Sequence, residues 1–222
     1  YAGLNGDVDE VTFERISNEN PYVNSNLPLA HTIRNFDLSV GLRGSLVEGL
    51  GFDVGARSAI YSNMYFYVND PDEFNKFQVV FDAGNTALFQ IYASMSYIKG
   101  KNLGSNLSAR VNGWSPGKVD KAWHRPALEF NYSLWYNFFD KVRLYADLFA
   151  ISGIKAVDYR NEPAEVITLK GAADLSLKME YLLSEKYGVF VNLNNLANNN
   201  YQLYYRYPSR GLLAIAGLKI SL

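Results

Sequence analysis

The stretch that decides the fold is residues 35–45, which reads Asn-Phe-Asp-Leu-Ser-Val-Gly-Leu-Arg-Gly-Ser. Phe36, Leu38, Val40 and Leu42 alternate along it with polar or small residues. Successive side chains of a β-strand point to opposite sides, so this spacing puts the four apolar side chains on one face. A helix would spread the same residues around its circumference. Residues 35–45 are therefore predicted to form a strand with one apolar and one polar face.

The same alternation recurs along the rest of the chain. It predicts further strands at 1–6, 52–61, 76–98, 106–112, 128–136, 142–150, 167–181, 189–194 and 212–222. We interpret residues 76–98 as one long strand with a bulge near Gly84, and the alternative is a separate short strand at its beginning. No segment has a helical period. The predicted fold class is all-β, with about ten antiparallel strands of the length found in transmembrane β-barrels.

The predicted connections alternate between short turns and long loops. Short turns fall near residues 47–50, 99–104, 137–141 and 183–187. Long polar loops fall near residues 7–33, 64–76, 115–125, 155–166 and 198–210. Outer-membrane barrels have this arrangement, with short periplasmic turns at one end and longer extracellular loops at the other.

Composition excludes several classes of function. The 222 residues (25.0 kDa) carry a formal net charge of -1, which argues against nucleic acid as a partner. The chain has no cysteine and two histidines, so thiolate and multi-histidine metal sites are not expected, and no cofactor is predicted. No apolar run approaches the ~20 residues of a membrane helix. We expect residues 1–222 to form a single domain, because no linker or low-complexity tract interrupts them.

Alternation alone does not say whether the apolar faces point inward, as in a soluble barrel, or outward to lipid. Charges of both signs in the middle of the strands favour a polar lumen and a lipid-facing apolar side. These expected lumen charges are Asp37, Arg43, Asp53, Arg57, Glu129, Arg143, Asp147, Lys170 and Asp174. Aromatic residues gather at strand ends, as they do at membrane–water interfaces. They are Tyr65, Phe66, Tyr67, Tyr136, Phe138, Phe139, Tyr201, Tyr204, Tyr205 and Tyr207.

The C-terminal residues resemble a known family. They read Val-Asn-Leu-Asn-Asn-Leu-Ala-Asn-Asn-Asn-Tyr at 191–201, followed by Tyr-Pro-Ser-Arg-Gly at 207–211 and a last alternating strand. This is similar to the C-terminal end of TonB-dependent outer-membrane receptors. The matching positions are Asn195, Leu196, Tyr201, Pro208, Arg210 and the terminal Leu222. The family usually ends in Phe, which the barrel assembly machinery is thought to read, and Leu222 departs from that pattern.

The resemblance implies a transport protein in the outer membrane of a Gram-negative bacterium, surrounded by outer-membrane lipid. It implies ligand binding at the extracellular loops and passage through the barrel, driven by the TonB energy-coupling complex through a plug domain that this sequence does not contain. The family's barrel has about twice the strands predicted here, so we expect the chain to be the C-terminal part of a larger barrel. The alternatives are a small passive porin-like or structural barrel, a barrel-embedded hydrolase and a soluble β-barrel ligand carrier.

The long loops supply the expected ligand contacts. Tyr201, Tyr204, Tyr205 and Arg206 form the first group, because tyrosine rings stack on sugars or planar ligands and a guanidinium holds an anion. Trp114 and Trp123 flank another long loop. The competing interpretation of the tyrosines is an aromatic girdle at the lipid interface.

Other candidate sites have weaker signals. His31 and His124 are expected to be solvated loop residues, and His124 with Asp120 is the one candidate pair for a barrel hydrolase. No serine nucleophile motif is present. Asp70, Asp72 and Glu73 lack the spacing of an EF-hand, so a solvated turn is expected there and no metal site is predicted.

Overall fold

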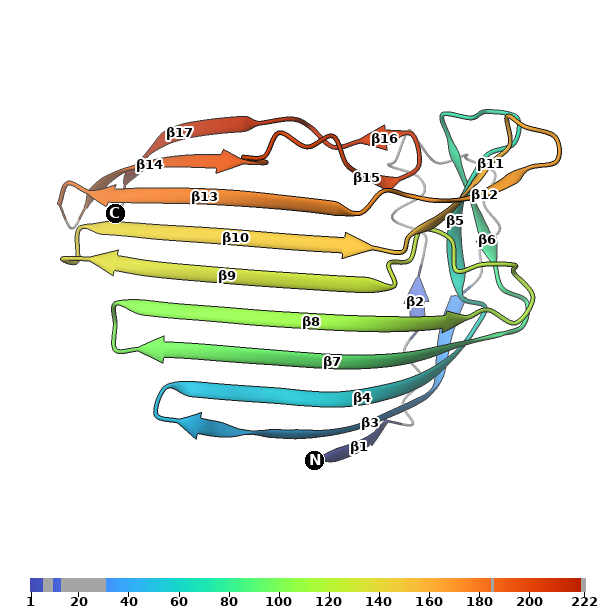
Figure 1. The fold of residues 1–222 in the computed structure, drawn as a ribbon, viewed down its shortest axis with the longest axis horizontal. Coiled ribbons are helices and arrows are strands. Elements are labelled where there is room, and N and C mark those ends of the chain that lie inside the picture. The colour runs from blue at the N-terminus through green and yellow to red at the C-terminus, as the bar shows by residue number, and fades with distance from the viewer. Residues whose placement is uncertain (6–9, 13–30, 185, 221–222) are drawn as a thin grey trace.

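The computed structural model describes residues 1–5, 10–12, 31–184 and 186–220, which form seventeen strands and no helix (Figure 1). The strands are β1 (Ala2–Asn5), β2 (Glu10–Thr12), β3 (His31–Val47), β4 (Leu50–Ser62), β5 (Tyr65–Asn69), β6 (Phe77–Phe81), β7 (Asn85–Lys99), β8 (Leu103–Ser115), β9 (Leu128–Phe138), β10 (Val142–Ser152), β11 (Lys155–Asp158), β12 (Glu165–Thr168), β13 (Ala172–Leu182), β14 (Tyr187–Asn194), β15 (Gln202–Tyr204), β16 (Tyr207–Pro208) and β17 (Leu213–Ile220). None of the described segments is a helix long and apolar enough to cross a bilayer.

One large antiparallel sheet makes up most of the molecule. Its strand order is β1-β3-β4-β7-β8-β9-β10-β13-β14-β17, with β2 also paired to β3. We call this sheet the wall. Its strands lie side by side in the order in which they follow one another along the chain, as the meander in Figure 1 shows. In this order β1 and β17 are the two edges, so the wall formed by the described residues is open rather than closed. The prediction of about ten antiparallel wall strands is confirmed.

The two ends of the wall differ, as the loop lengths predicted. Tight turns join β3 to β4, β7 to β8, β9 to β10 and β13 to β14 at one end, on the left of Figure 1. Gly49 and Gly100 supply positive φ angles in two of these turns, which glycine adopts without a steric penalty. The longer connections among the described residues lie at the opposite end, which we call the loop end.

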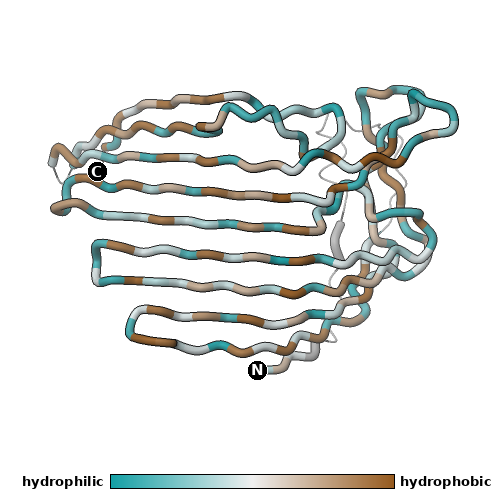
Figure 2. Tube along the Cα trace, viewed as in Figure 1, coloured by the Kyte–Doolittle hydropathy of each residue, from teal (hydrophilic) through white to brown (hydrophobic). Residues whose placement is uncertain are grey.

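The apolar face of the wall is exposed. Phe89 and Ile91 of β7 and Val111 of β8 are each more than half exposed, at 54%, 53% and 52%. Between them, Gln90 and Tyr92 are partly covered on the polar face. Figure 2 shows this residue-by-residue alternation along each wall strand. A soluble barrel would bury these side chains, because each large apolar side chain left in water costs about 1.5–3 kcal/mol. The wall therefore has the pattern of a transmembrane β-barrel, with its apolar face toward lipid and its polar face toward the lumen.

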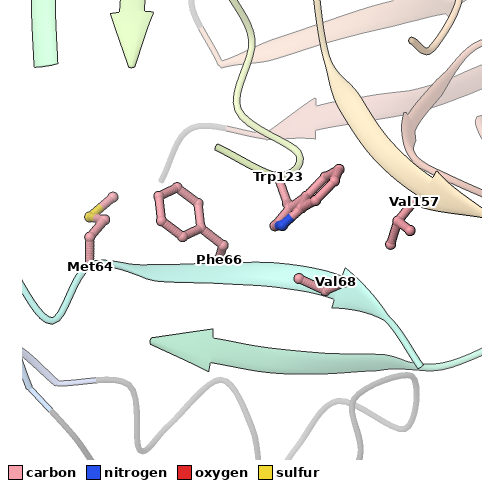
Figure 3. Packing of buried hydrophobic residues seen from close by; sticks show 5 residues of the cluster. All are labelled: Met64, Phe66, Val68, Trp123 and Val157. Atoms are coloured by element: carbon pink, nitrogen blue, oxygen red, sulfur yellow. The ribbon is translucent and has the colours of Figure 1, made fainter. Parts of the chain in front are cut away.

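The buried core lies at the loop end. Met64, Phe66, Val68, Trp123 and Val157 form its main cluster, in which the Phe66 side chain is fully buried (Figure 3). The hairpin of β5 and β6 contributes Phe66 and Val68, Met64 lies directly before it, and the hairpin of β11 and β12 contributes Val157. A third small sheet, β15 with β16, lies beside them. The long loops are therefore folded together on a hydrophobic core of their own.

Residues 76–98 do not form one strand, and that prediction is wrong. Phe77–Phe81 is a separate strand, β6, which pairs with Tyr65–Asn69 outside the wall, and the wall strand β7 begins at Asn85. Asp82 separates the two, because its carboxylate is bound by backbone groups of a distant loop. The predicted strand 167–181 is likewise divided, into β12 and β13.

The aromatic girdle forms only in part. Tyr136, Phe138 and Phe139 do lie at the β9–β10 turn, where Phe139 is 93% exposed. Phe66, in contrast, lies in the core at the loop end, because β5 leaves the wall and folds into the loops. The predicted interfacial position of Phe66 is therefore wrong.

Candidate functional site

Three segments far apart in the sequence meet at the loop end. They are the β5–β6 hairpin, the connection 116–127 between β8 and β9, and the segment 201–208 that contains β15 and β16. A parallel bridge from Trp123 to Lys155 attaches the second of them to β11. The Tyr207 hydroxyl donates to the carbonyl oxygen of Asn75, which attaches the third to the β5–β6 turn.

Asp82 fixes the 116–127 connection. Its side chain is fully buried and accepts hydrogen bonds from the Thr86 hydroxyl (2.5 Å) and from the backbone N–H groups of Gly117 and Lys118 (2.8 Å each). Burial alone would raise the pKa of this carboxyl, but these hydrogen bonds to the charged form lower it to about 2. The carboxylate is therefore ionised at neutral pH and holds the connection against the start of β7.

His124 joins all three segments. Its Nδ1 lies 2.7 Å from the Tyr67 carbonyl oxygen, and its Nε2 accepts from the Tyr205 backbone N–H at 3.2 Å. An N–H donor facing Nε2 and a carbonyl facing Nδ1 together require the neutral ring with its proton on Nδ1. Burial lowers the pKa of His124 to about 4, in spite of the opposing effect of the Tyr67 carbonyl. The expectation of a solvated loop histidine is wrong for His124, which is 8% exposed.

Aromatic rings surround His124. Phe77 lies edge-on to the imidazole at 5.4 Å between ring centroids, and Tyr204 lies on it at 5.3 Å with a 30° tilt. Tyr204 also contacts Tyr67 and Phe77, and Phe77 contacts Tyr207. We call these five rings (Tyr67, Phe77, His124, Tyr204 and Tyr207) the aromatic cluster. Tyr204 is its exposed member, and it presents a ring to the solvent at the loop end.

A cation lies next to the aromatic cluster. The Arg125 guanidinium is 5.1 Å from the ring centroid of Tyr65 and 5.8 Å from that of Trp114, both within cation–π range. It also donates to the Tyr65 carbonyl oxygen at 3.2 Å. Arg125 is only partly exposed, so it acts mainly as a structural contact between the hairpin and the 116–127 connection.

Tyr205 connects the segment 201–208 to the β11–β12 hairpin. Its hydroxyl donates to Asp158 Oδ2 at 2.9 Å and accepts from Arg160 Nη2 at 2.7 Å. Arg160 also pairs with Asp158, and this pairing holds the pKa of the Asp158 carboxyl well below its usual range. The Tyr205 side chain is thus already engaged within the protein.

The predicted ligand contacts are distributed over different surroundings. Tyr204 and Arg206 are exposed at the loop end, and Arg206 has a φ of 70° in the turn between β15 and β16. Trp123 is buried in the hydrophobic core, and Trp114 is partly buried against it. Tyr201 lies on the polar face of the wall, with its hydroxyl on Asp174 (3.1 Å) and its ring edge-on to Phe149. The girdle interpretation is therefore wrong for Tyr201.

The C-terminal motif organises the chain between β14 and β17. Asn195, buried and with φ 52°, donates from Nδ2 to the carbonyl oxygens of Asn199 (2.9 Å) and Arg210 (2.8 Å). Its Oδ1 accepts a hydrogen bond from the Asn199 N–H. The Asn195 side chain therefore closes the predicted loop near residues 198–210. Pro208 lies in β16, and the Leu196 N–H donates to Leu175 in β13. Leu222 is outside the described residues.

The predicted lumen charges lie on the polar face of the wall, with one exception. Arg43 binds Asp53 at 2.5 Å, and Arg57 binds Asp37 through two hydrogen bonds of 2.7 and 2.6 Å. The pairing register places Arg143, Asp147 and Asp174 on the same face of β10 and β13, and Glu129 on that of β9. Lys170 is the exception, because it lies in the connection between β12 and β13. Its mid-strand position was a wrong prediction.

The structure does not support the hydrolase pair. Both ring nitrogens of His124 face backbone groups, so neither binds Asp120, which is exposed. Asp70 accepts the backbone N–H groups of Asp72 and Glu73 and so closes its own turn. Among the described residues, no group of three His, Asp or Glu side chains could hold a metal ion.

Sequence reasoning missed Asp82, Phe77 and the role of His124. The available signal for Asp82 was its position inside an apolar run, two residues before Gly84. A carboxylate in such a run indicates that the strand is interrupted there. The partners of Asp82 at 117 and 118 are far away in the sequence, so the bond itself had no local signature.

The wall and the loop end together have the architecture of part of a transmembrane β-barrel, with aromatic-rich loops folded at one end. No protein-family model matches the sequence, and no curated protein sequence matches it either. Solved structures do match it. The chain has the fold of part of the barrel of TonB-dependent receptors, which is the family that its C-terminal residues resemble.

Three of these structures illustrate the likeness. The ferripyoverdine receptor of the outer membrane of Pseudomonas aeruginosa is 13% identical over 99% of this chain and 31% of its own, with a TM-score of 0.65. The siderophore receptor PiuA from Acinetobacter baumannii is 10% identical over 92% of this chain and 30% of its own (TM-score 0.63). The copper transporter OprC is 14% identical over 92% and 33% (TM-score 0.62). The chain therefore spans about a third of each structure that it matches.

Proposed function

We propose that this chain is the C-terminal part of the barrel of a TonB-dependent outer-membrane receptor in a Gram-negative bacterium. The receptor binds its ligand at the loop end and passes it along the polar face of the wall. The observation that carries the proposal is the combination of an exposed apolar face with a folded loop end that presents Tyr204 on a cluster of packed rings. The match to about a third of each receptor structure supports a larger barrel.

Energy coupling is the part of the proposal that rests on resemblance alone. A plug domain, contact with TonB and insertion by the barrel assembly machinery belong to the family that the chain resembles. The structural matches to receptors and transporters favour a protein that is not an enzyme.

The size and location of the native polypeptide test the proposal. An antibody to residues 201–210 would be used on fractionated cell envelopes. A band far larger than 25.0 kDa in the outer membrane is expected. A band at 25.0 kDa would contradict a larger receptor, and a signal in the soluble fraction would contradict the membrane assignment.

The ligand surface is tested with the ligands named for the matching structures. Ferripyoverdine and Cu²⁺ are the two probes, and binding to the purified native protein is followed by quenching of intrinsic fluorescence. Tyr204→Ala is expected to weaken the affinity for ferripyoverdine at least tenfold, because it removes the exposed ring of the aromatic cluster. Tyr187→Ala, at the opposite end of the wall, is the matched control. Equal losses in both variants would contradict binding at the loop end.

A further inference from the structure

The polar face carries a hollow that is lined by residues of β3, β4, β7 and β8. Its volume is about 500 Å³, which is in the range of small-molecule sites. None of the residues that line it belongs to the aromatic cluster. Three arginines, Arg43, Arg57 and Arg110, stand around it.

The register of the sheet explains why a hollow forms there. Gly41, Gly55, Tyr92 and Arg110 are successive partners across four strands. The two glycines leave room for tyrosine rings, and a Cβ atom on Gly55 would lie 2.5 Å from the Tyr92 hydroxyl oxygen. The Tyr92 ring therefore lies over β4, and its hydroxyl contacts that of Tyr1.

The adjacent set of cross-strand partners forms the bottom of the hollow. Asp53, Ser94 and Ser108 are successive partners on β4, β7 and β8. The serine side chains are short, so the space in front of them stays open. Their hydroxyl groups line the hollow beside Arg110.

The charges around the hollow are unequally satisfied. Asp53 receives two hydrogen bonds from Arg43 and one from the Tyr1 hydroxyl, so the Arg43 charge is compensated. Asp37 accepts two hydrogen bonds from Arg57, as described above, and also pairs with Arg34 at 2.8 Å. Arg43 and Arg57 are held in place by carboxylates of the wall itself.

Arg110 differs from both. Among the described residues its ion pair is with Glu129, at 3.9 Å, which is too long for a hydrogen bond. The hydrogen bond of the Glu129 carboxylate is made to another residue, because its Oε1 accepts from Asn112 Nδ2 at 2.7 Å. The Arg110 side chain is 53% exposed and lines the hollow, so its planar set of donors is accessible there.

We propose that this hollow is a binding subsite for a carboxylate group of a small anionic solute. The Arg110 guanidinium binds the carboxylate through two N–H groups, and Ser94 and Ser108 donate hydroxyl hydrogen bonds to it. The inference rests on the proposed function, since it places a second site on the path that a ligand would follow along the polar face.

The test measures citrate binding to the full-length protein in detergent by calorimetry at low salt. Arg110→Gln is expected to weaken citrate binding at least tenfold, and Arg110→Lys is expected to retain part of it, because lysine keeps the charge but loses the planar pair of donors. Glu129→Gln is expected to strengthen binding several-fold, because it removes the competing carboxylate. Arg143→Gln removes another polar-face arginine, and it is the matched control with less than a twofold effect.

Three results would overturn the subsite. They are unchanged affinity in Arg110→Gln, an equal loss in Arg143→Gln, and no citrate binding by the wild type. If the wild type does not bind citrate and Arg110→Gln has a lower melting temperature, an acidic side chain of the protein occupies the hollow. Failure of the proposed function is distinguishable, because unchanged loop-end binding in Tyr204→Ala or a soluble location would leave the citrate result unaffected.

Discussion

Asp82 shows how one side chain can organise the loop end. Its carboxylate is fully buried, yet it is charged at neutral pH because N–H and hydroxyl donors surround it. These donors come from β7 and from the 116–127 connection, so the carboxylate links two segments that the chain brings together only in the folded state.

Asp82→Asn is expected to destabilise the loop end by about 1–3 kcal/mol, because the amide offers a donor to groups that are themselves donors. The folded-state pKa of about 2 lies below the ordinary 3.8, so the stabilisation is present above pH ~4 and is lost as the pH falls toward 2. Protease cleavage of residues 116–127 measures the effect. Asp120→Asn, in the same connection but exposed, should cleave like the wild type, and equal cleavage of both variants would contradict the role of Asp82.

His124 makes the loop end sensitive to mild acid. Its pKa is lowered from 6.5 to about 4, so the unfolded chain binds a proton over this range that the folded loop end does not. The stabilisation is complete above pH ~6.5 and decreases as the pH falls toward 4. Protonation would also replace the Nε2 acceptor by a donor facing the Tyr205 N–H.

Amide hydrogen exchange at Tyr205 measures this dependence, after correction for the intrinsic pH dependence of exchange. Protection is expected to fall between pH 6.5 and 4 in the wild type and to stay level in His124→Gln. The chain has one other histidine, and His31→Gln should keep the wild-type profile. A profile that is the same in His124→Gln and the wild type would disprove the assignment.

Among the elements, the wall strands could be predicted from the sequence and the hairpins of the loop end could not. Period-two alternation identifies any strand with one apolar face, which suffices for β3, β4 and β7–β10. The same period continues through β6 into β7, so it gives no sign that β6 leaves the wall. That departure depends on Asp82 and on packing around Phe66, which are contacts between segments distant in the sequence.

The exposed residues of the candidate site could be predicted from the sequence, and the residues that surround them could not. Tyr204 and Arg206 were expected at the loop end and are exposed there, because loop tyrosine and arginine have a simple local signal. The surroundings of Tyr204 had no such signal. Phe77 and His124 reach it from two other segments, and only the fold brings them together.

Glycines of the wall strands are places where a ring lies against the sheet. Trp135 lies over Gly104, and a Cβ atom there would come within 2.2 Å of the indole nitrogen. Gly104→Ala is therefore expected to destabilise the wall by about 1–3 kcal/mol through overpacking. Gly113→Ala is the control, since its nearest neighbour would be at 3.5 Å. Denaturant unfolding in detergent compares the two, and equal midpoints would refute the packing argument.

For the whole molecule, the exposed apolar face of the wall is the feature that requires a lipid environment. Val111 lies on this face in the loop-end half of β8, paired with Ile91. Val111→Arg is expected to disfavour insertion into lipid vesicles by up to about 2–4 kcal/mol, since the cost of a cation is greatest at the bilayer midplane and falls toward the interfaces. Asn106→Arg, on the polar face of the same strand, is expected to insert normally. Folded fractions are measured by gel mobility without heating, and equal insertion of both variants would contradict a lipid-facing Val111.

The most direct test of the central claim is the direction in which each face of the wall points in the native membrane. The chain has no cysteine, so single cysteines placed at each position from Phe89 to Met95 report on one site at a time. In intact outer membranes, a water-soluble maleimide is expected to label positions 90, 92 and 94 and to spare 89, 91, 93 and 95. The spared positions should react once detergent is added and the protein is denatured. Labelling without this alternation, labelling of the opposite set, or recovery of the protein from the soluble fraction would contradict a transmembrane barrel wall.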